Sequence, residues 1–163
     1  MDAHPLIRRS SLPGGLHVAA WAFVVLSYAV GFFLASGTTL GRRLEEMGGG
    51  SATGWDKVLH ATGFFLFGLL LFQLFVVVNS VWRRSPGLFL PSAVSFLLGS
   101  IYAGIHEAGQ ALFPSLVPEA SDVIADVLGL SAAIFLYALW RSTERVVGSP
   151  GPGERRPDWW ERP

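Results

Sequence analysis

The chain has 163 residues, of which 51% are hydrophobic and only 15% are charged, and its twelve Lys and Arg residues balance twelve Asp and Glu residues. This composition argues against an ordinary soluble domain and makes a lipid bilayer the expected environment. Cysteine is absent, which excludes disulfides, thiolate metal sites and a cysteine nucleophile. Any chemistry must therefore use oxygen and nitrogen groups.

Four apolar stretches are long enough to cross a membrane, because a spanning helix needs about 20 mostly apolar residues. The first follows Arg8 and Arg9 and exceeds the roughly 7 to 15 apolar residues of a signal-peptide core, so we expect a retained span. The sequence predicts an all-α membrane protein, a four-transmembrane-helix bundle that crosses the plasma membrane several times. The predicted parts are an N-terminal tail (1–15), a membrane domain (16–141, with spans 16–36, 58–82, 88–113 and 122–140) and a disordered C-terminal tail (142–163).

The distribution of basic residues predicts the orientation of the spans. Nine of the twelve Lys and Arg residues lie in the two tails and in the short loop between the second and third spans, whereas three lie in the region 37–57. Cytoplasmic segments carry an excess of Lys and Arg. We therefore expect both termini in the cytoplasm, with the start of the second span, the end of the third and the start of the fourth at the extracytoplasmic face.

Polar residues gather at those three span ends. An ionisable side chain at the centre of a spanning helix costs roughly 2.5 to 3.5 kcal/mol and usually faces the bundle interior or a water-filled cavity. We interpret His60 and Glu107 as the central, catalytic pair of a site, although a contact of Glu107 with His60 or Lys57 could also serve only to hold helices together. The residues of this polar layer are Asp56, Lys57, His60, Glu107, Gln110, Asp122 and Asp126.

Small residues recur at every fourth position of three spans and predict close helix packing, since they let backbones approach in lipid. The expected packing stripes are Ser27, Gly31 and Ala35; Ser100, Gly104 and Ala108; and Ala125, Gly129 and Ala133.

Several catalytic patterns are excluded. The segment 106–110, His-Glu-Ala-Gly-Gln, resembles a zinc-protease motif, but Gln110 stands where the second histidine is needed. Ser121 beside Asp122 lacks a nucleophile elbow. There is no phosphate-binding loop, and the dispersed arginines predict no nucleic-acid partner. No cofactor is predicted, although carboxylates could hold a divalent cation with waters; these are Asp56, Glu107, Asp122 and Asp126.

The polar positions together resemble a known family, the VanZ-like integral membrane proteins, over roughly half of the chain, residues 55–136. The residues that carry the resemblance are Asp56-Lys57-x-x-His60, Glu107-x-x-Gln110 followed by Pro114, and Asp122 with Gly129. The family's namesake is associated with resistance to the glycopeptide antibiotic teicoplanin. The resemblance therefore implies a role at the cell envelope or in the response to such agents, without naming a mechanism.

Two departures from the family pattern affect the expected ligand. The family usually has an arginine in the loop between the last two spans, but residues 115–121 contain none, and Asp126 stands where asparagine is usual. Arginine is the natural partner of phosphate and carboxylate groups. A cation or a proton therefore suits this site better than an anion.

Besides the role that the family resemblance implies, three other classes of function remain possible. An enzyme acting on a lipid-linked envelope molecule would use Glu107 or His60 as general acid or base. A structural or partner-binding protein, including a homo-oligomer in the bilayer, would tolerate changes that preserve charge. A transporter would need a polar path, which the cytoplasmic halves of the spans hardly offer, with only Gln73, Asn79, Ser92 and Ser95.

Overall fold

The computed structural model describes residues 14–36, 43, 47–49, 54–82, 87–113 and 118–147. Within these ranges it contains four long helices and no strand: α1 (Gly14–Ser36), α3 (Trp55–Trp82), α4 (Phe89–Gln110) and α5 (Ala120–Val147). All four are long and apolar enough to cross a membrane. The predicted all-α, membrane-type architecture is therefore confirmed; residues 1–13 of the predicted N-terminal tail lie outside the described residues, and residues 14 and 15 already belong to α1.

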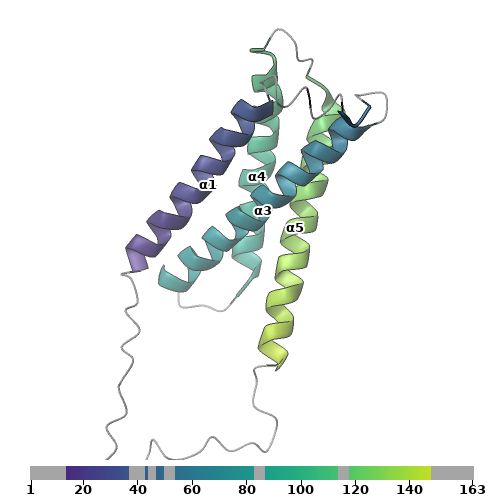
Figure 1. Cartoon of the computed structure of the whole chain (residues 1–163). Helices are drawn as coiled ribbons and strands as arrows, with labels where there is room; N and C mark the ends of the chain where they lie inside the picture. The colour runs from purple at the N-terminus through teal and green to yellow at the C-terminus, as the bar shows by residue number, and fades with distance from the viewer. Residues whose placement is uncertain are drawn as a thin grey trace, which may run out of the picture.

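The helices run alternately up and down, and α3 lies at the centre of the bundle against α1, α4 and α5 (Figure 1). This arrangement brings together the end of α1, the start of α3, the end of α4 and the start of α5. We call this end of the molecule the polar end, because the polar layer predicted from the sequence lies there.

Helix α1 begins two residues before the predicted span 16–36 and ends where predicted, at Ser36, and the other helices differ from the predicted spans for identifiable reasons. Helix α3 begins three residues early, with Asp56 in its first turn, where a carboxylate interacts favourably with the helix dipole. Helix α4 ends at Gln110, and the next three residues form tight turns, each donating an N–H to the carbonyl three residues earlier. Hydropathy identifies the apolar part of a helix, whereas the backbone hydrogen bonds decide where the helix begins and ends.

The predicted start of the disordered tail at residue 142 is wrong for its first residues. Helix α5 continues to Val147, past Arg141 and through the polar residues that follow it. A helix needs no apolar side chains once it has left the hydrocarbon, because water can solvate its polar side chains there. The remainder of the tail, 148–163, lies outside the described residues.

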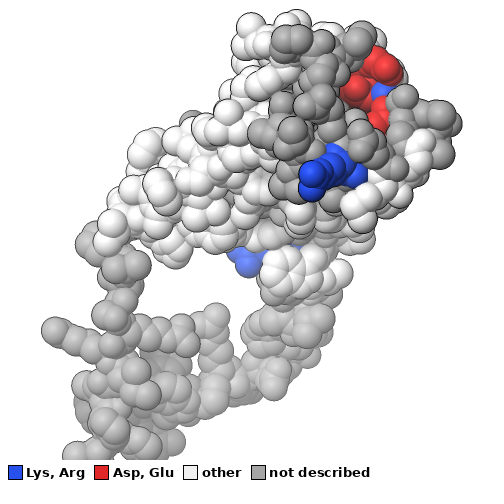
Figure 2. All heavy atoms as spheres, turned by 45° about the horizontal axis from the view of Figure 1, so that its top comes forward, with Lys and Arg blue, Asp and Glu red and all other residues white. Residues whose placement is uncertain are grey.

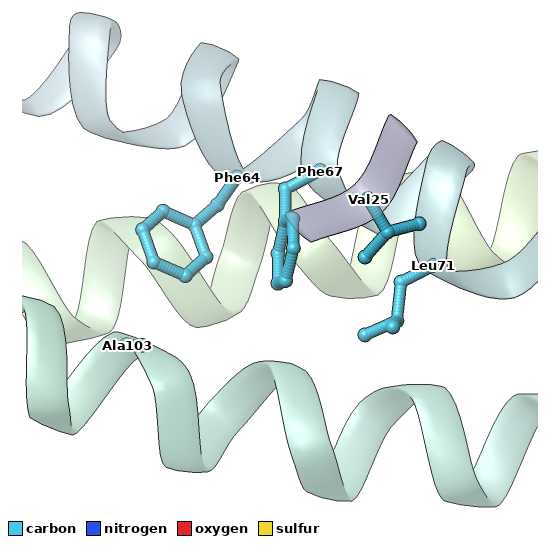
Figure 3. Close-up of a cluster of buried hydrophobic side chains, with 5 residues drawn as sticks. All are labelled: Val25, Phe64, Phe67, Leu71 and Ala103. Carbon is cyan, nitrogen blue, oxygen red and sulfur yellow. The ribbon is translucent and has the colours of Figure 1, made fainter. Parts of the chain in front are cut away.

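The outside of the bundle is apolar and the inside contains both aromatic and polar groups. Large hydrophobic side chains such as Phe23, Leu97 and Phe135 are exposed on three different helices, as expected for a lipid-facing surface. The interior has a core cluster from α1, α3 and α4 (Figure 3), made of Val25, Phe64, Phe67, Leu71 and Ala103.

One of the three predicted packing stripes faces another helix. A Cβ atom on Gly129 of α5 would lie 2.0 Å from the carbonyl oxygen of Ala61, so α3 and α5 touch backbone to backbone there. By contrast, a Cβ on Gly31 or Gly104 would meet nothing within 4 Å. Gly31 and Gly104 therefore face outward, because the spacing of small residues does not distinguish a helix partner from lipid.

Candidate functional site

Six of the seven predicted site residues are buried at the polar end, and Lys57 is half-buried beside them. They come from the first two turns of α3 and α5 and the last turn of α4. Figure 2 shows acidic side chains gathered at this end with a basic side chain among them. The buried members are Asp56, His60, Glu107, Gln110, Asp122 and Asp126. Three segments far apart in the sequence thus form one cluster.

Lys57 binds three carboxylates at the edge of the cluster. Its Nζ lies 2.9 Å from Asp56 Oδ2 and 2.8 Å from Glu119 Oε2, and it also forms an ion pair with Asp122. The hydrogen bond from Lys57 lowers the pKa of the Glu119 carboxyl, with a further contribution from the Ser121 hydroxyl. Lys57 therefore links the start of α3 to the start of α5 and is surrounded by negative charge.

A histidine–aspartate pair lies deeper in the bundle. His60 Nδ1 is 3.0 Å from Asp126 Oδ1, and Asp126 has no exposed surface. The other ring nitrogen of His60, Nε2, is 3.9 Å from Asp122 Oδ2. A carboxylate on one ring nitrogen fixes the orientation and tautomer of an imidazole, so His60 is held between two carboxylates of α5.

Glu107 is a neighbour of His60 rather than its hydrogen-bond partner. One carboxylate oxygen, Oε1, accepts a hydrogen bond from the backbone N–H of Glu119, just before α5. The other oxygen, Oε2, is buried without a partner. Ligand atoms of Glu107, His60 and Asp122 nevertheless lie within 4.8 Å of one another. The predicted central pair is thus brought together, with Asp126 holding the imidazole.

His106 is a central residue that the sequence reasoning missed. It has no exposed surface, and its ring lies 5.6 Å from the ring of His60 and 5.0 Å from that of Phe32. The sequence carried a signal, because Ala103, His106 and Gln110 recur at i, i+3 and i+7, the spacing of one buried helix face. In the sequence, His106 stands out only as part of an incomplete zinc-protease motif.

Two further contacts come from residues outside the predicted polar layer. Ser36, at the end of α1, places its Oγ 3.1 Å from His106 Nε2, and Glu119 contacts Lys57 from the residue before α5. Neither has a sequence signal of its own, because a serine at a helix end and a glutamate in a loop are ordinary features.

Aromatic rings separate the cluster from the rest of the bundle. Phe64 has no exposed surface, and its ring contacts those of Phe32, Tyr102 and His106 at 5.6 to 5.8 Å. The hydroxyl of Tyr102 donates a hydrogen bond to the carbonyl of Ala29. The buried charges therefore lie above an apolar layer, where electrostatic interactions are stronger than in water.

An open groove of about 550 Å³ runs between α3 and α5. Lys57 lines it, and almost all of its other lining residues are apolar. The full lining is Lys57, Val58, Ala61, Thr62, Phe65, Ala125, Leu128, Gly129 and Ala132. This groove offers apolar contact area beside a charged group, the pattern that an amphiphilic molecule requires.

Comparison of the chain with protein-family models, curated proteins and solved structures finds no match.

Proposed function

We propose that the protein is a VanZ-like multi-pass membrane protein that acts at the extracytoplasmic face of the plasma membrane, on the cell envelope or in the response to glycopeptide antibiotics. The observation that carries the proposal is the buried cluster at the polar end. It unites the residues of the Asp56-Lys57-x-x-His60 segment with Glu107 and Asp122. A bundle held together by packing alone has no need of these charges, which are costly to bury.

The orientation rests on the excess of basic residues in the tails and the short loop 83–87. Reporter fusions in the loop 37–54 and in the C-terminal tail test it. We expect extracytoplasmic activity for the first fusion and cytoplasmic activity for the second. The reverse result would place the cluster at the cytoplasmic face. The proposed action at the extracytoplasmic face would then be wrong.

The groove between α3 and α5 favours a more specific candidate, an enzyme that acts on a lipid-linked envelope molecule. The apolar tail of such a molecule would lie along Val58, Phe65 and Leu128, with its headgroup near Lys57. His60, oriented by Asp126, and Glu107, with one free carboxylate oxygen, would act as general acid and base. These groups can transfer protons to and from a headgroup without a covalent intermediate.

The carboxylates around Lys57 limit which headgroup the site accepts. Lys57 contacts Asp56, Glu119 and Asp122, so its positive charge is already neutralised. Since the described residues place no arginine in the cluster, a bare anionic group would meet mainly negative charge. A neutral or cationic headgroup, or an anion accompanied by a cation, fits these charges better.

Deletion of the gene followed by rescue tests the proposed function. Envelope lipid composition and teicoplanin susceptibility are compared after rescue with wild type, His60→Ala, Glu107→Gln and the control His17→Ala, which removes an exposed histidine of α1. We expect wild type and His17→Ala to restore both readouts. Glu107→Gln should lower turnover by about 10²- to 10⁴-fold, the usual contribution of a general acid or base, while the protein still accumulates in the membrane.

Full rescue by both His60→Ala and Glu107→Gln at wild-type abundance would show that the cluster has no catalytic role. Rescue by charge-preserving changes, such as Asp126→Glu together with Glu107→Asp, but not by Glu107→Gln, would favour a structural or partner-binding protein instead.

A further inference from the structure

In the middle of the cluster, one imidazole nitrogen and one carboxylate oxygen are buried without a hydrogen-bond partner. They are His106 Nδ1 and Asp126 Oδ2, and both residues have no exposed surface. A buried polar atom left without a partner costs about 1 to 3 kcal/mol. Two such atoms on facing helices, α4 and α5, call for a group that can bind both.

The hydrogen bonds of Ser36 determine which nitrogen of His106 carries the proton. The Ser36 hydroxyl donates its only proton to the carbonyl of Phe33, at 2.8 Å. Its oxygen lies 3.1 Å from His106 Nε2 and must therefore accept a hydrogen bond there. In the neutral ring, the proton is thus on Nε2, and Nδ1 has a free lone pair. A cation can bind this nitrogen, whereas a hydrogen-bond acceptor cannot.

We propose that His60, His106 and Asp126 form a binding site for a divalent transition-metal ion such as Zn²⁺. One ligand atom from each residue lies within 4.8 Å of the other two. Tetrahedral Zn²⁺, with bonds of about 2.0 to 2.2 Å, brings its ligand atoms to within about 3.3 Å of one another. His60 Nδ1 and Asp126 Oδ1 are already 3.0 Å apart, so the ligand atoms need to approach one another by at most about 1.5 Å.

The donor set decides the class of metal. Two imidazole nitrogens and one carboxylate suit Zn²⁺ and similar transition metals, whereas Mg²⁺ and Ca²⁺ prefer oxygen ligands alone. The four carboxylates predicted as cation ligands do not form one such group, since Asp56 groups with Glu119 and Asp122 instead. That oxygen-only group is already bound to Lys57, which makes the histidine-containing group the better metal site.

The residues around the three ligands support an ion there. Ser36 fixes the ring of His106 through Nε2, the kind of outer contact that metal-binding histidines usually make. Glu107 and Asp122 approach His60 and supply further negative charge. Three protein ligands also leave a coordination position open for water or for a substrate group. With the ion bound, His60 and Asp126 would bind it in place of their mutual hydrogen bond, and Glu107 would remain as the acid or base. The metal site depends on this donor geometry and not on the proposed envelope function.

Metal binding by the full-length protein tests the inference. The protein is purified in detergent through a tag without histidines, stripped with a chelator and titrated with Zn²⁺, with Mg²⁺ as the comparison ion. We expect one Zn²⁺ per chain, measured by elemental analysis, and a rise in the unfolding temperature that Mg²⁺ does not give. His106→Ala should lower the Zn²⁺ affinity at least 100-fold, and Ser36→Ala about 10- to 100-fold, while His17→Ala should leave it unchanged.

The unfolding temperature of each stripped variant shows whether the change has affected the fold itself. Asp126→Asn serves as a second ligand variant if His106→Ala does not fold, because it preserves side-chain volume while weakening the metal bond. The inference is overturned if the wild type retains no Zn²⁺, which would mean that water or a proton bridges the two atoms. It is equally overturned if Mg²⁺ binds as well as Zn²⁺, or if Glu107→Gln abolishes binding while His106→Ala and Asp126→Asn do not.

Discussion

The two halves of the bundle are built from the same four helices, but they differ in which polar groups they bury and in how those groups are hydrogen-bonded. In the half away from the polar end, the buried polar side chains that the structure describes, Asn79 and Ser95, are neutral. Ser80 and Ser92 donate to carbonyls three or four residues earlier on the same helix, and Asn79 donates to the carbonyl of Gly87. At the polar end, charged groups contact one another across helices, and the buried atoms without a hydrogen-bond partner belong to carboxylates and an imidazole, whereas elsewhere they belong to serine hydroxyls. Helix packing in this protein therefore does not require charge, and the charged cluster needs a separate explanation.

The largest expected effect comes from forcing apart the two helices that hold the cluster. Gly129→Val places side-chain atoms against the backbone of Ala61, which cannot move without shifting α3. We expect the variant to lose the folded bundle and to accumulate poorly in the membrane. Gly31→Val is the matched control, because a Cβ there meets nothing within 4 Å. Unfolding in detergent, followed by tryptophan fluorescence, compares the two, and equal stability would show that the α3–α5 contact is not tight.

A smaller effect is expected from removing the aromatic layer beneath the cluster. Phe64→Ala leaves a cavity next to His106 and should lower the free energy of unfolding by about 3 to 5 kcal/mol. The control Phe23→Ala changes a ring that is 71% exposed and should cost much less. Thermal or denaturant unfolding measures both. If Phe64→Ala were as mild as the control, the charged half would not depend on this layer.

The smallest effect is expected in the neutral half. Tyr137→Phe removes the hydrogen bond from the Tyr137 hydroxyl to Gln73. Interhelical hydrogen bonds in membrane proteins contribute about 0.6 kcal/mol on average, so stability should fall by about that amount. Rescue of the gene deletion should remain complete. A loss of rescue at normal abundance would contradict the assignment of function to the polar end alone.

The sequence predicted the helices well because the bilayer imposes a simple rule on length and hydrophobicity. It also predicted which residues form the cluster, since a charge at a span end must turn inward or toward the interface. It could not predict the pairing within the cluster. The choice of Asp126 over Glu107 as the partner of His60 depends on how α5 is rotated against α3, and that rotation is set by the contact of Gly129 with Ala61.

His106 shows a second limit of the sequence. Its neighbour Glu107 lies about 100° away around the helix, and a helix at the edge of a bundle would bury only one of two adjacent residues. Both are buried because Phe32 of α1 covers His106 on one side while the residue before α5 contacts Glu107 on the other. Such enclosure depends on the arrangement of all four helices, which the pattern of one segment does not contain.

The unequal exposure of the carboxylates around Lys57 has a consequence for ionic strength. The Glu119 side chain is 48% exposed, whereas that of Asp122 is 8% exposed. Dissolved salt weakens interactions between exposed charges over a screening length of about 8 Å at physiological concentration and about 3 Å at 1 M, and it affects buried charges much less. Rising salt should therefore release the Glu119 contact first and leave the link to Asp122 intact. The Glu119 side chain can be released in this way while the ends of α3 and α5 stay joined, so the edge of the polar end responds to its surroundings before its interior does.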